Sequence, residues 1–566
     1  MNNLEGIEAV DRRGFMAYMS AVGLGGTLLP GVLWAQLQER REITSEILAD
    51  ASAVAGIDFT EEERDQMVAG LNGNLQSYEA LREIPIPNSV APAVQFDPAL
   101  PGRELPSETR PFRFTRHLGL RRPPDPETLA FMPVTQLSEL IRTRQLSATE
   151  LTTLYLDRLE RHGPTLEAVI TLMGDRALEH AARADREIAS GAYRGPLHGI
   201  PWGAKDLLAA EGFRTTWGAR PFEDQVIAED ATVVRRLEEA GAILVAKLTL
   251  GALAQGDYWY GGRTRNPWNL EQGSSGSSAG SAAATAAGLV GFAIGSETLG
   301  SIVSPSTRCG VTGLRPTFGR VSRSGAMALS WSMDKLGPIA RSVEDCALVF
   351  DRIHGADGRD PTARTAPFNW DSDRPLSDLR VGYFRRGFES ERATRHDAAA
   401  LETLRSLGVA PVPIDLPTDY PLGALRIILN AEAAAAFDEL TLSGRDDLLV
   451  RQTRGSWPNS FRTARMIPAV EYIQANRVRT MLMGALEATL EGIDVFITPT
   501  SGPGVSMITN LTGHPAVVVP SGFNDNGTPV STVFIGQLWA DAEVLRVAKA
   551  WQDATDFHTR RPPLFG

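Results

Sequence analysis

Short apolar runs alternate with amphipathic stretches over most of the chain. Four runs have the length and composition of buried strands: residues 242–246, 290–294, 493–498 and 515–520. Helical periodicity occupies segments between them, for example around residues 233–240 and 281–287. This alternation predicts an α/β fold, in which a central mixed or parallel sheet is covered by helices on both faces.

Two capping boxes mark the beginnings of predicted helices. The sequence Ser-Ala-Thr-Glu at 147–150 begins a helix that we expect to end at His-Gly-Pro, residues 162–164. The sequence Thr-Glu-Glu-Glu at 60–63 begins another, so residues 36–84 are predicted to form two short helices.

Residues 85–126 are rich in proline and arginine. We interpret them as an irregular arm over the main domain, or as a linker. Three apolar side chains give the arm something to bury: Phe112, Phe114 and Leu118. The sequence thus predicts an N-terminal extension over 36–126 and a globular domain over 127–566.

The first 35 residues resemble a twin-arginine export signal. Arg12 and Arg13 precede a weakly apolar, glycine-rich run, residues 15–35. Acidic residues before the run, and Leu33 three positions before a cleavage point after Ala35, depart from such a signal. A buried N-terminal helix is the alternative. We expect export to the periplasm, or a cytoplasmic location if the signal does not function, and no stable membrane span.

The bulk composition excludes several kinds of protein. The net charge is −12, so we expect no nucleic-acid partner. Two cysteines in 566 residues allow neither a disulfide scaffold nor a paired CxxC metal site. The eight histidines form no HExxH or similar pair, so we expect no catalytic metal and no other cofactor.

One lysine and two glycine- and serine-rich loops carry the candidate chemistry. Lys205 lies at a predicted strand end, Ser277 in the first loop and Ser301 in the second. A serine hydroxyl is a poor nucleophile unless a base takes its proton. No histidine lies in either loop, but a buried lysine that is neutral can act as that base.

The first loop also matches a different hydrolase motif. Its sequence Gly-Ser-Ser-Ala-Gly at 276–280 fits G-x-S-x-G, the nucleophile elbow of α/β hydrolases, with Ser278 as the nucleophile. That motif needs a strand directly before it, and residues 265–273 are predicted to form a loop. We therefore set the elbow interpretation aside.

These segments, with an ordered series of motifs from about Leu137 to the C-terminus, resemble the amidase signature family. The series includes Gly-Val-Thr-Gly-Leu-Arg-Pro-Thr at 310–317, Asp-Lys-Leu-Gly-Pro-Ile-Ala-Arg-Ser at 334–342 and Asn-Leu-Thr-Gly-His-Pro-Ala at 510–516. The resemblance implies a three-layer α/β/α fold. It also implies an enzyme that cleaves carboxamide C–N bonds through an acyl-enzyme.

The resemblance further implies a role for each candidate residue. Ser301 is the expected nucleophile, and Ser277 is the bridging serine, with a cis peptide bond beside it. Lys205 is the base that acts through Ser277, and Ser278 supports them. Backbone N–H groups of the nucleophile loop are expected to form the oxyanion hole: those of Thr298, Leu299, Gly300 and Ser301.

Three positions near the nucleophile depart from the family pattern. Glu297 stands where the family usually has Asp, Leu299 where it has Gly, and Val303 where it has Arg. If residue 299 must adopt a positive φ, its leucine costs about 1–2 kcal/mol. Without an arginine at 303, we expect the acid at 297 to lack its ion-pair partner.

The expected function is that of an amidase, which releases ammonia or an amine from a small-molecule amide, with a homodimer as an open option. One alternative is the glutaminase-type A-subunit of a tRNA-dependent amidotransferase, and another is an inactive scaffold on the same fold. Specificity is expected from residues 380–480, which are predicted to be partly helical. Four aromatic residues there either line an aryl pocket or belong to the core: Tyr420, Trp457, Phe461 and Tyr472.

Overall fold

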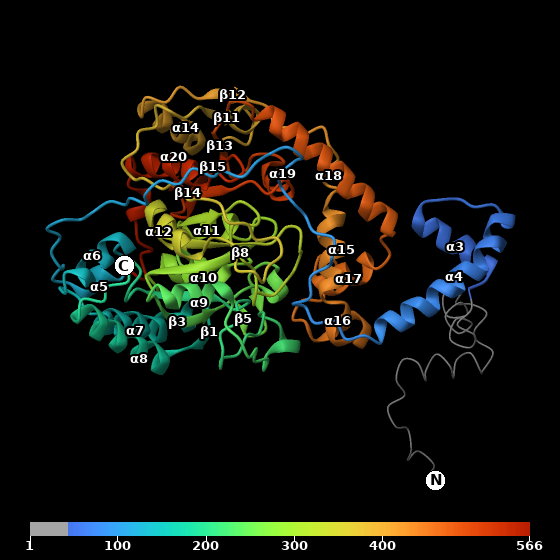
Figure 1. Ribbon diagram of the computed structural model, residues 1–566, viewed down its shortest axis with the longest axis horizontal. Coiled ribbons are helices and arrows are strands. Elements are labelled where there is room, and N and C mark those ends of the chain that lie inside the picture. The colour runs from blue at the N-terminus through green and yellow to red at the C-terminus, as the bar shows by residue number, and fades with distance from the viewer. Residues whose placement is uncertain (1–42) are drawn as a thin grey trace, which may run out of the picture. The chain divides into compact units, whose positions relative to one another are not determined.

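The structure, a computed structural model, describes residues 43–566, so the predicted export signal lies outside the described residues. Contacts divide the chain into two compact units. One contains the helices α3 (Ser45–Ala55) and α4 (Glu61–Arg82), and the other begins at Asn88 (Figure 1). Among the helices described, none is long and apolar enough to cross a membrane.

An 11-stranded mixed sheet forms the centre of the larger unit. In spatial order its strands are β1 (Val169–Leu172), β3 (Ile243–Leu248), β2 (Pro201–Lys205), β8 (Phe292–Glu297), β10 (Lys335–Ala340), β9 (Thr312–Arg315), β14 (Ala516–Phe523), β15 (Pro529–Gly536), β13 (Val495–Pro499), β11 (Val381–Phe384) and β12 (Val412–Ile414). The strands β3, β2 and β8 run parallel, as do β13, β11 and β12. Antiparallel strands join the two groups.

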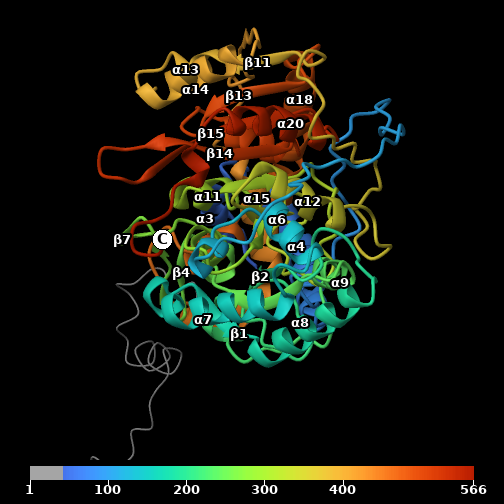
Figure 2. The ribbon, with the colours of Figure 1, turned by 90° about the vertical axis from the view of Figure 1, so that its left-hand side faces the viewer.

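Helices pack against this sheet along its length. They include α6 (Val134–Arg142), α7 (Ala148–Leu166), α8 (Gly174–Ala189), α9 (Thr232–Glu239), α10 (Ala279–Ala286), α11 (Val303–Cys309), α12 (Val343–Ile353), α14 (Arg395–Ser406) and α20 (Asp541–Asp553). The helices α7 and α8 contact β1 and β3 at one end of the sheet (Figure 2), and α20 contacts β14 and β15. The predicted α/β fold with a central mixed sheet between helical layers is confirmed.

Further helices lie beyond the sheet: α15 (Arg426–Ala436), α16 (Asp438–Ser443), α17 (Trp457–Ala464), α18 (Ala469–Thr489) and α19 (Val505–Leu511). The helix α15 packs against both α17 and α18. The stretches around 426–436 and 457–489 are thus helical, as the sequence indicates.

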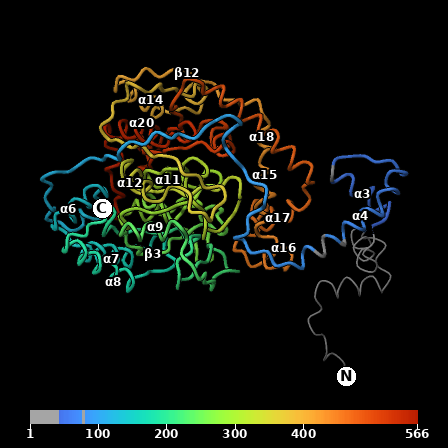
Figure 3. Tube along the Cα trace, viewed as in Figure 1, coloured from blue at the N-terminus to red at the C-terminus, as the bar shows by residue number. Residues whose placement is uncertain are grey.

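The arm from Asn88 to Asp125 packs on the larger unit (Figure 3). Within it the structure has no regular helix or strand, only an isolated bridge between Arg113 and Asp371. The ring of Phe112 lies 6.1 Å from that of Phe368, whereas Leu118 stays 81% exposed. Only part of the apolar surface predicted to hold the arm is therefore used.

Two local expectations are wrong. The helix α7 does not end at 162–164 but continues to Leu166 with Pro164 inside it. The proline removes one N–H bond in the last turn only, and Glu167, at φ 49°, closes that turn. Residues 265–273 form a small ribbon of β6 (Arg265–Asn266) and β7 (Asn269–Gly273) rather than a loop.

Candidate active site

The parallel strands β2 and β8 bring the first candidate residues together. Ala204 pairs with Ile294 across these strands, and the ring of Trp202 stacks on that of Phe292 with centroids 5.9 Å apart. Because parallel strands end at the same edge of a sheet, Lys205 at the end of β2 comes next to Ser296 near the end of β8.

Lys205 is completely buried among serine hydroxyls. Its Nζ lies 2.8 Å from Ser277 Oγ, 3.0 Å from Ser278 Oγ and 2.8 Å from Ser296 Oγ. Burial lowers the pKa of Lys205 well below its ordinary value, although the charges of Asp334 and Glu297 act in the opposite direction. The site thus favours the neutral amine, which is the form that can accept a proton.

Ser277 lies in a loop whose backbone is closely packed. The peptide bond between Gly276 and Ser277 is cis, as the family resemblance implies. A Cβ at position 276 would lie 1.9 Å from the Gly256 carbonyl oxygen, so only glycine fits there. The next residue, Ser278, donates its backbone N–H to the Ser301 carbonyl at 3.1 Å and so links this loop to the nucleophile loop.

The side chain of Ser278 is fully buried in a structural position. Its hydroxyl donates to the Ser296 carbonyl and accepts the Ser296 N–H, each at 3.1 Å. The ribbon before it is separate from the main sheet. Because a nucleophile must be exposed to substrate, this position does not suit the α/β-hydrolase elbow.

Glu297 clamps the loop that carries Ser301. Its Oε2 accepts the backbone N–H groups of Ile302 at 2.8 Å and Val303 at 3.0 Å. Its Oε1 receives Arg315 Nη1 at 2.8 Å and Asn510 Nδ2 at 2.9 Å. Burial acts to raise the pKa of Glu297, but Arg315 and these hydrogen bonds prevail and lower it to about 2.

The structure corrects both concerns about the departures from the family pattern. The acid at 297 has an ion-pair partner despite Val303, because Arg315 reaches it from β9. Leu299 is not among the described residues with a positive φ; that conformation falls on Gly300, at 83°. No left-handed strain therefore arises at Leu299.

Four consecutive backbone N–H groups are free to bind an oxyanion. In the described part of the chain, no protein group accepts the N–H of residues 298, 299, 300 or 301. The hydroxyl of Thr298 donates to Asp334, which fixes the beginning of this loop. These are the donors that the family resemblance implies for the oxyanion hole.

Ser301 itself is 9% exposed. Over residues 43–566 its hydroxyl makes no hydrogen bond, including none to Ser277. The structure therefore assembles Lys205, Ser277 and Ser278 directly, and holds Ser301 beside them through backbone contacts. Ser296, which the sequence analysis missed, completes the surroundings of the lysine.

A cavity of about 310 Å³ adjoins these residues. Ser296, Thr298 and Asp334 form its side toward the site. Its other walls are largely apolar and include Leu207, Met327, Leu329, Trp331 and Leu336, with Asn88, Ser89 and Ala91 from the arm. The loop from 323 to 336 thus contributes more to this cavity than residues 380–480, from which we expected specificity.

The four aromatic candidates from that region do not line this cavity. Trp457 and Phe461 are buried and stack on each other with centroids 5.1 Å apart. Tyr420 donates to the Met481 carbonyl, and Tyr472 donates to Glu432. Trp331 is the aromatic residue at the cavity, and no motif in the sequence marked it for that position.

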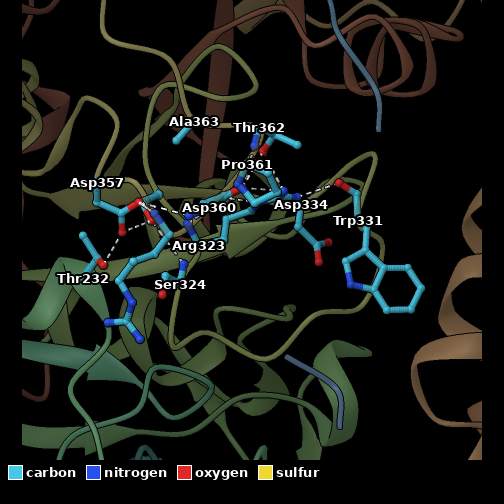
Figure 4. A network of polar contacts seen from close by, with 12 residues as sticks. Thr232, Arg323, Ser324, Trp331, Asp334, Asp357, Asp360, Pro361, Thr362 and Ala363 are labelled. Carbon is cyan, nitrogen blue, oxygen red and sulfur yellow. Dashed lines mark hydrogen bonds and ion pairs between the residues drawn. The ribbon is translucent and has the colours of Figure 1, made fainter. Parts of the chain in front are cut away.

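Every charged side chain that lines the cavity has a partner. Arg323 Nε lies 2.9 Å from Asp360 Oδ2, and Arg323 also donates to the Trp331 carbonyl at 2.7 Å (Figure 4). Arg359 pairs with Glu229. Asp334 accepts the backbone N–H groups of residues 329 and 330 besides the Thr298 hydroxyl. No group of three or more acidic, histidine or cysteine side chains suited to a metal occurs in the described residues.

Comparisons with known proteins agree with this geometry. The sequence profile of the family described as Amidase matches residues 150–504. The A-subunit of glutamyl-tRNA(Gln) amidotransferase from Moorella thermoacetica is 36% identical over 484 residues, covering 77% of this chain and 99% of that protein. The native peptide amidase of Stenotrophomonas maltophilia is 32% identical, with a TM-score of 0.69, covering 78% of this chain and 100% of that one. The corresponding A-subunit from Thermotoga maritima is 28% identical, with a TM-score of 0.63, covering 76% and 95%.

Proposed function

The chain belongs to the amidase signature family, and on that premise we propose that it hydrolyses an amide C–N bond through an acyl-enzyme on Ser301. The observation that carries this proposal is the buried Lys205, whose Nζ lies 2.8 Å from Ser277 Oγ. Its pKa is lowered, so it can serve as a base without a histidine. The serine that it contacts is adjacent in sequence to the residue that bonds Ser301.

In the proposed reaction, Lys205 takes a proton from Ser277 as Ser277 takes one from Ser301. The Ser301 Oγ then attacks the amide carbon, and the backbone N–H groups of residues 298–301 stabilise the resulting oxyanion. The relay returns the proton to the leaving nitrogen, the C–N bond breaks, and ammonia or an amine departs. Water cleaves the ester by the same route. The relay requires the Ser301 hydroxyl to turn toward Ser277 when substrate binds.

The cavity favours an uncharged substrate. Its charged side chains, Glu229, Arg323, Asp334, Arg359 and Asp360, are already engaged with protein groups. A charged substrate would have to break these pairs or remain unpaired, which costs free energy in a partly buried site. We therefore infer a neutral carboxamide as the substrate and a hydrolase of linear amides as the activity.

The second candidate is the glutamine-hydrolysing A-subunit of an amidotransferase. The curated relatives carry that name, and they support this candidate more strongly than the first. Its activity would involve partner subunits. Glutamine carries an ammonium and a carboxylate group, however, and the described cavity offers no unpaired charge to either.

Ammonia release by the purified chain tests both candidates. We expect hydrolysis of a neutral amide such as 2-phenylacetamide and little hydrolysis of L-glutamine, with both lost in Ser301→Ala. Glutamine hydrolysis that depends on Ser301 and exceeds that of neutral amides would favour the second candidate. If a serine-directed fluorophosphonate fails to label the wild-type chain at Ser301, the chain is the inactive scaffold.

The proposed location rests on the sequence alone. Arg12 and Arg13 before the glycine-rich run support export through the twin-arginine route. An exported enzyme would act away from tRNA, which agrees with the first candidate rather than the second.

A further inference from the structure

The arm and the loop that carries Trp331 meet at the cavity beside the active site. We propose that the arm forms part of the substrate pocket, that Asn88 positions this wall, and that the pocket selects amides with a flat apolar group that packs on Trp331. This inference rests on the proposed function and adds a substrate class to it. Asn88 is a positioning residue, because it acts through the wall and takes no part in the reaction.

Asn88 uses both ends of its side-chain amide to hold the wall. Its Oδ1 accepts the backbone N–H of Ala328 at 2.7 Å, and its Nδ2 donates to the Ala328 carbonyl at 2.9 Å. The Nδ2 also donates to the carbonyl of Ala436, the last residue of α15, at 3.3 Å. One side chain thus joins the arm, the cavity loop and a helix end, where carbonyl groups otherwise lack partners.

The neighbouring residues of the cavity loop are held from the opposite side. Glu432 accepts the Ser330 hydroxyl at 2.6 Å, and the Ser332 hydroxyl and N–H at 2.7 and 3.0 Å. Arg323 holds the carbonyl of Trp331 itself. The backbone on both sides of Trp331 is therefore fixed, and its ring points away from the Arg323 network (Figure 4). A residue held in this way presents a rigid surface to a ligand.

Asp334 connects this wall to the oxyanion-binding loop. One of its oxygens accepts the N–H groups of Leu329 and Ser330 at 2.8 and 2.9 Å, and the other receives the Thr298 hydroxyl. Thr298 lines the same cavity. A substrate group that packs on Trp331 therefore lies in the cavity that the N–H groups of the nucleophile loop adjoin.

The arm is an addition to the part of the chain shared with relatives. The family match begins at residue 150, whereas the cavity-lining arm residues are 88, 89 and 91. About three quarters of this chain covers nearly the whole Moorella protein. The arm thus gives a shared catalytic site a wall of its own, and we expect it to affect the choice of substrate more than the chemistry.

Substitution of Asn88 tests the proposal, with Asn369 as a matched control. Asn369 also holds the arm through both ends of its amide, at the Glu108 carbonyl (2.8 Å) and the Arg110 N–H (2.7 Å), but it does not line the cavity. We expect Asn88→Ala to lower the ratio of kcat/KM for 2-phenylacetamide to that for acetamide about tenfold, mainly through KM. Asn369→Ala should leave this ratio unchanged. Trp331→Ala should lower it, and the double variant with Asn88→Ala should add little more.

Two further measurements keep the outcome decisive. Ala91→Phe narrows the cavity without removing a hydrogen bond, and it should discriminate against 2-phenylacetamide even if Asn88→Ala does not fold. Calorimetric binding of 2-phenylacetamide to Ser301→Ala, with and without Trp331→Ala, tests the pocket independently of hydrolysis. Equal losses for both amides, equal effects of Asn88→Ala and Asn369→Ala, or binding that ignores Trp331 would overturn the inference. Trp331-dependent binding by a wild-type chain that hydrolyses no amide would instead remove the proposed function.

Discussion

Arg315 Nη1 lies 2.8 Å from Glu297 Oε1 in an ion pair whose side chains are 2% and 0% exposed. Arg315 is also held by the Thr509 hydroxyl and the His514 carbonyl, each at 2.9 Å. The pair fixes the carboxylate that in turn accepts the N–H groups of Ile302 and Val303. The shape of the nucleophile loop thus depends on a charge located on a different strand.

Loss of that arginine is expected to destabilise the fold. Arg315→Met leaves Glu297 as a buried, uncompensated charge, which costs about 3–5 kcal/mol of unfolding free energy. Urea denaturation of the purified variant measures this cost. The control is Arg560→Met, since Arg560 pairs with Asp556 at the surface, where both side chains are more than 60% exposed and solvent screens the pair. Equal denaturation midpoints for the two variants would contradict the expectation.

Acid should weaken the same clamp. The pKa of Glu297 lies near 2 in the folded chain, below its ordinary value of 4.5. The stability that it contributes is therefore fully present above about pH 4.5 and is lost as the pH falls toward 2. Denaturation midpoints of the wild type measured between pH 6 and pH 3 should decrease, and Glu297→Gln should reduce the slope of this decrease. An unchanged slope in that variant would remove Glu297 as its source.

Activity is expected to depend on deprotonation of Lys205. Burial lowers the pKa of Lys205, and the neutral form is the base, so kcat/KM should rise as the pH increases through this lowered pKa. The pH profile of the wild type measures it. An activity limb at the ordinary pKa of a lysine, or an optimum in the carboxylate range, contradicts the assignment of Lys205 as base.

Ser296 should tune that limb. Its hydroxyl accepts a hydrogen bond from Lys205 Nζ at 2.8 Å, which stabilises the charged form of the lysine. Ser296→Ala should therefore move the acid limb of kcat/KM toward lower pH. A shift toward higher pH, or no shift in a folded variant, would contradict this role.

The three proposed catalytic residues should differ in a defined order. Ser301→Ala should abolish both turnover and covalent labelling, because it removes the atom that is acylated. Ser277→Ala and Lys205→Ala should lower turnover strongly but permit slow labelling, and their combination should cost little more than either change. Ser278→Ala should be milder than Ser301→Ala, whereas the α/β-hydrolase elbow requires the reverse. Circular dichroism establishes that each variant is folded.

Export should depend on the paired arginines. Arg12→Lys combined with Arg13→Lys is expected to retain the protein in the cytoplasm, since the twin-arginine signal is recognised by a receptor. Cell fractionation and immunoblotting compare the variant with the wild type. Equal amounts of the two outside the cytoplasm would remove the export hypothesis.

The sequence predicts the sheet better than it predicts the limits of individual strands. The apolar run at 290–294 correctly indicates β8, but the strand continues through Ser296 to Glu297. These polar residues extend it because Glu297 pairs with Lys335 of β10 in the ladder and with Arg315 by charge. Hydrophobic periodicity does not register such partners, because they come from distant parts of the chain.

The candidate catalytic residues are legible from local motifs, whereas the cavity beside them is not. Lys205 and Ser277 lie in glycine-rich segments with a recognisable order. Trp331 lies in a loop that is positioned by Glu432 and, through Ala328, by Asn88, residues about 100 and 240 positions away in sequence. No local pattern reports contacts of that range, so specificity was expected in the wrong segment.

The contact of Asn88 with the cavity loop bears on how the protein is shortened for laboratory work. A fragment that begins at residue 127, where the globular sequence pattern begins, would keep Lys205, Ser277 and Ser301 but lose the residues at 88, 89 and 91 that line the cavity. Its recombinant product would present an intact reaction centre behind an open door, and its substrate profile would describe the trimmed fragment rather than the natural enzyme.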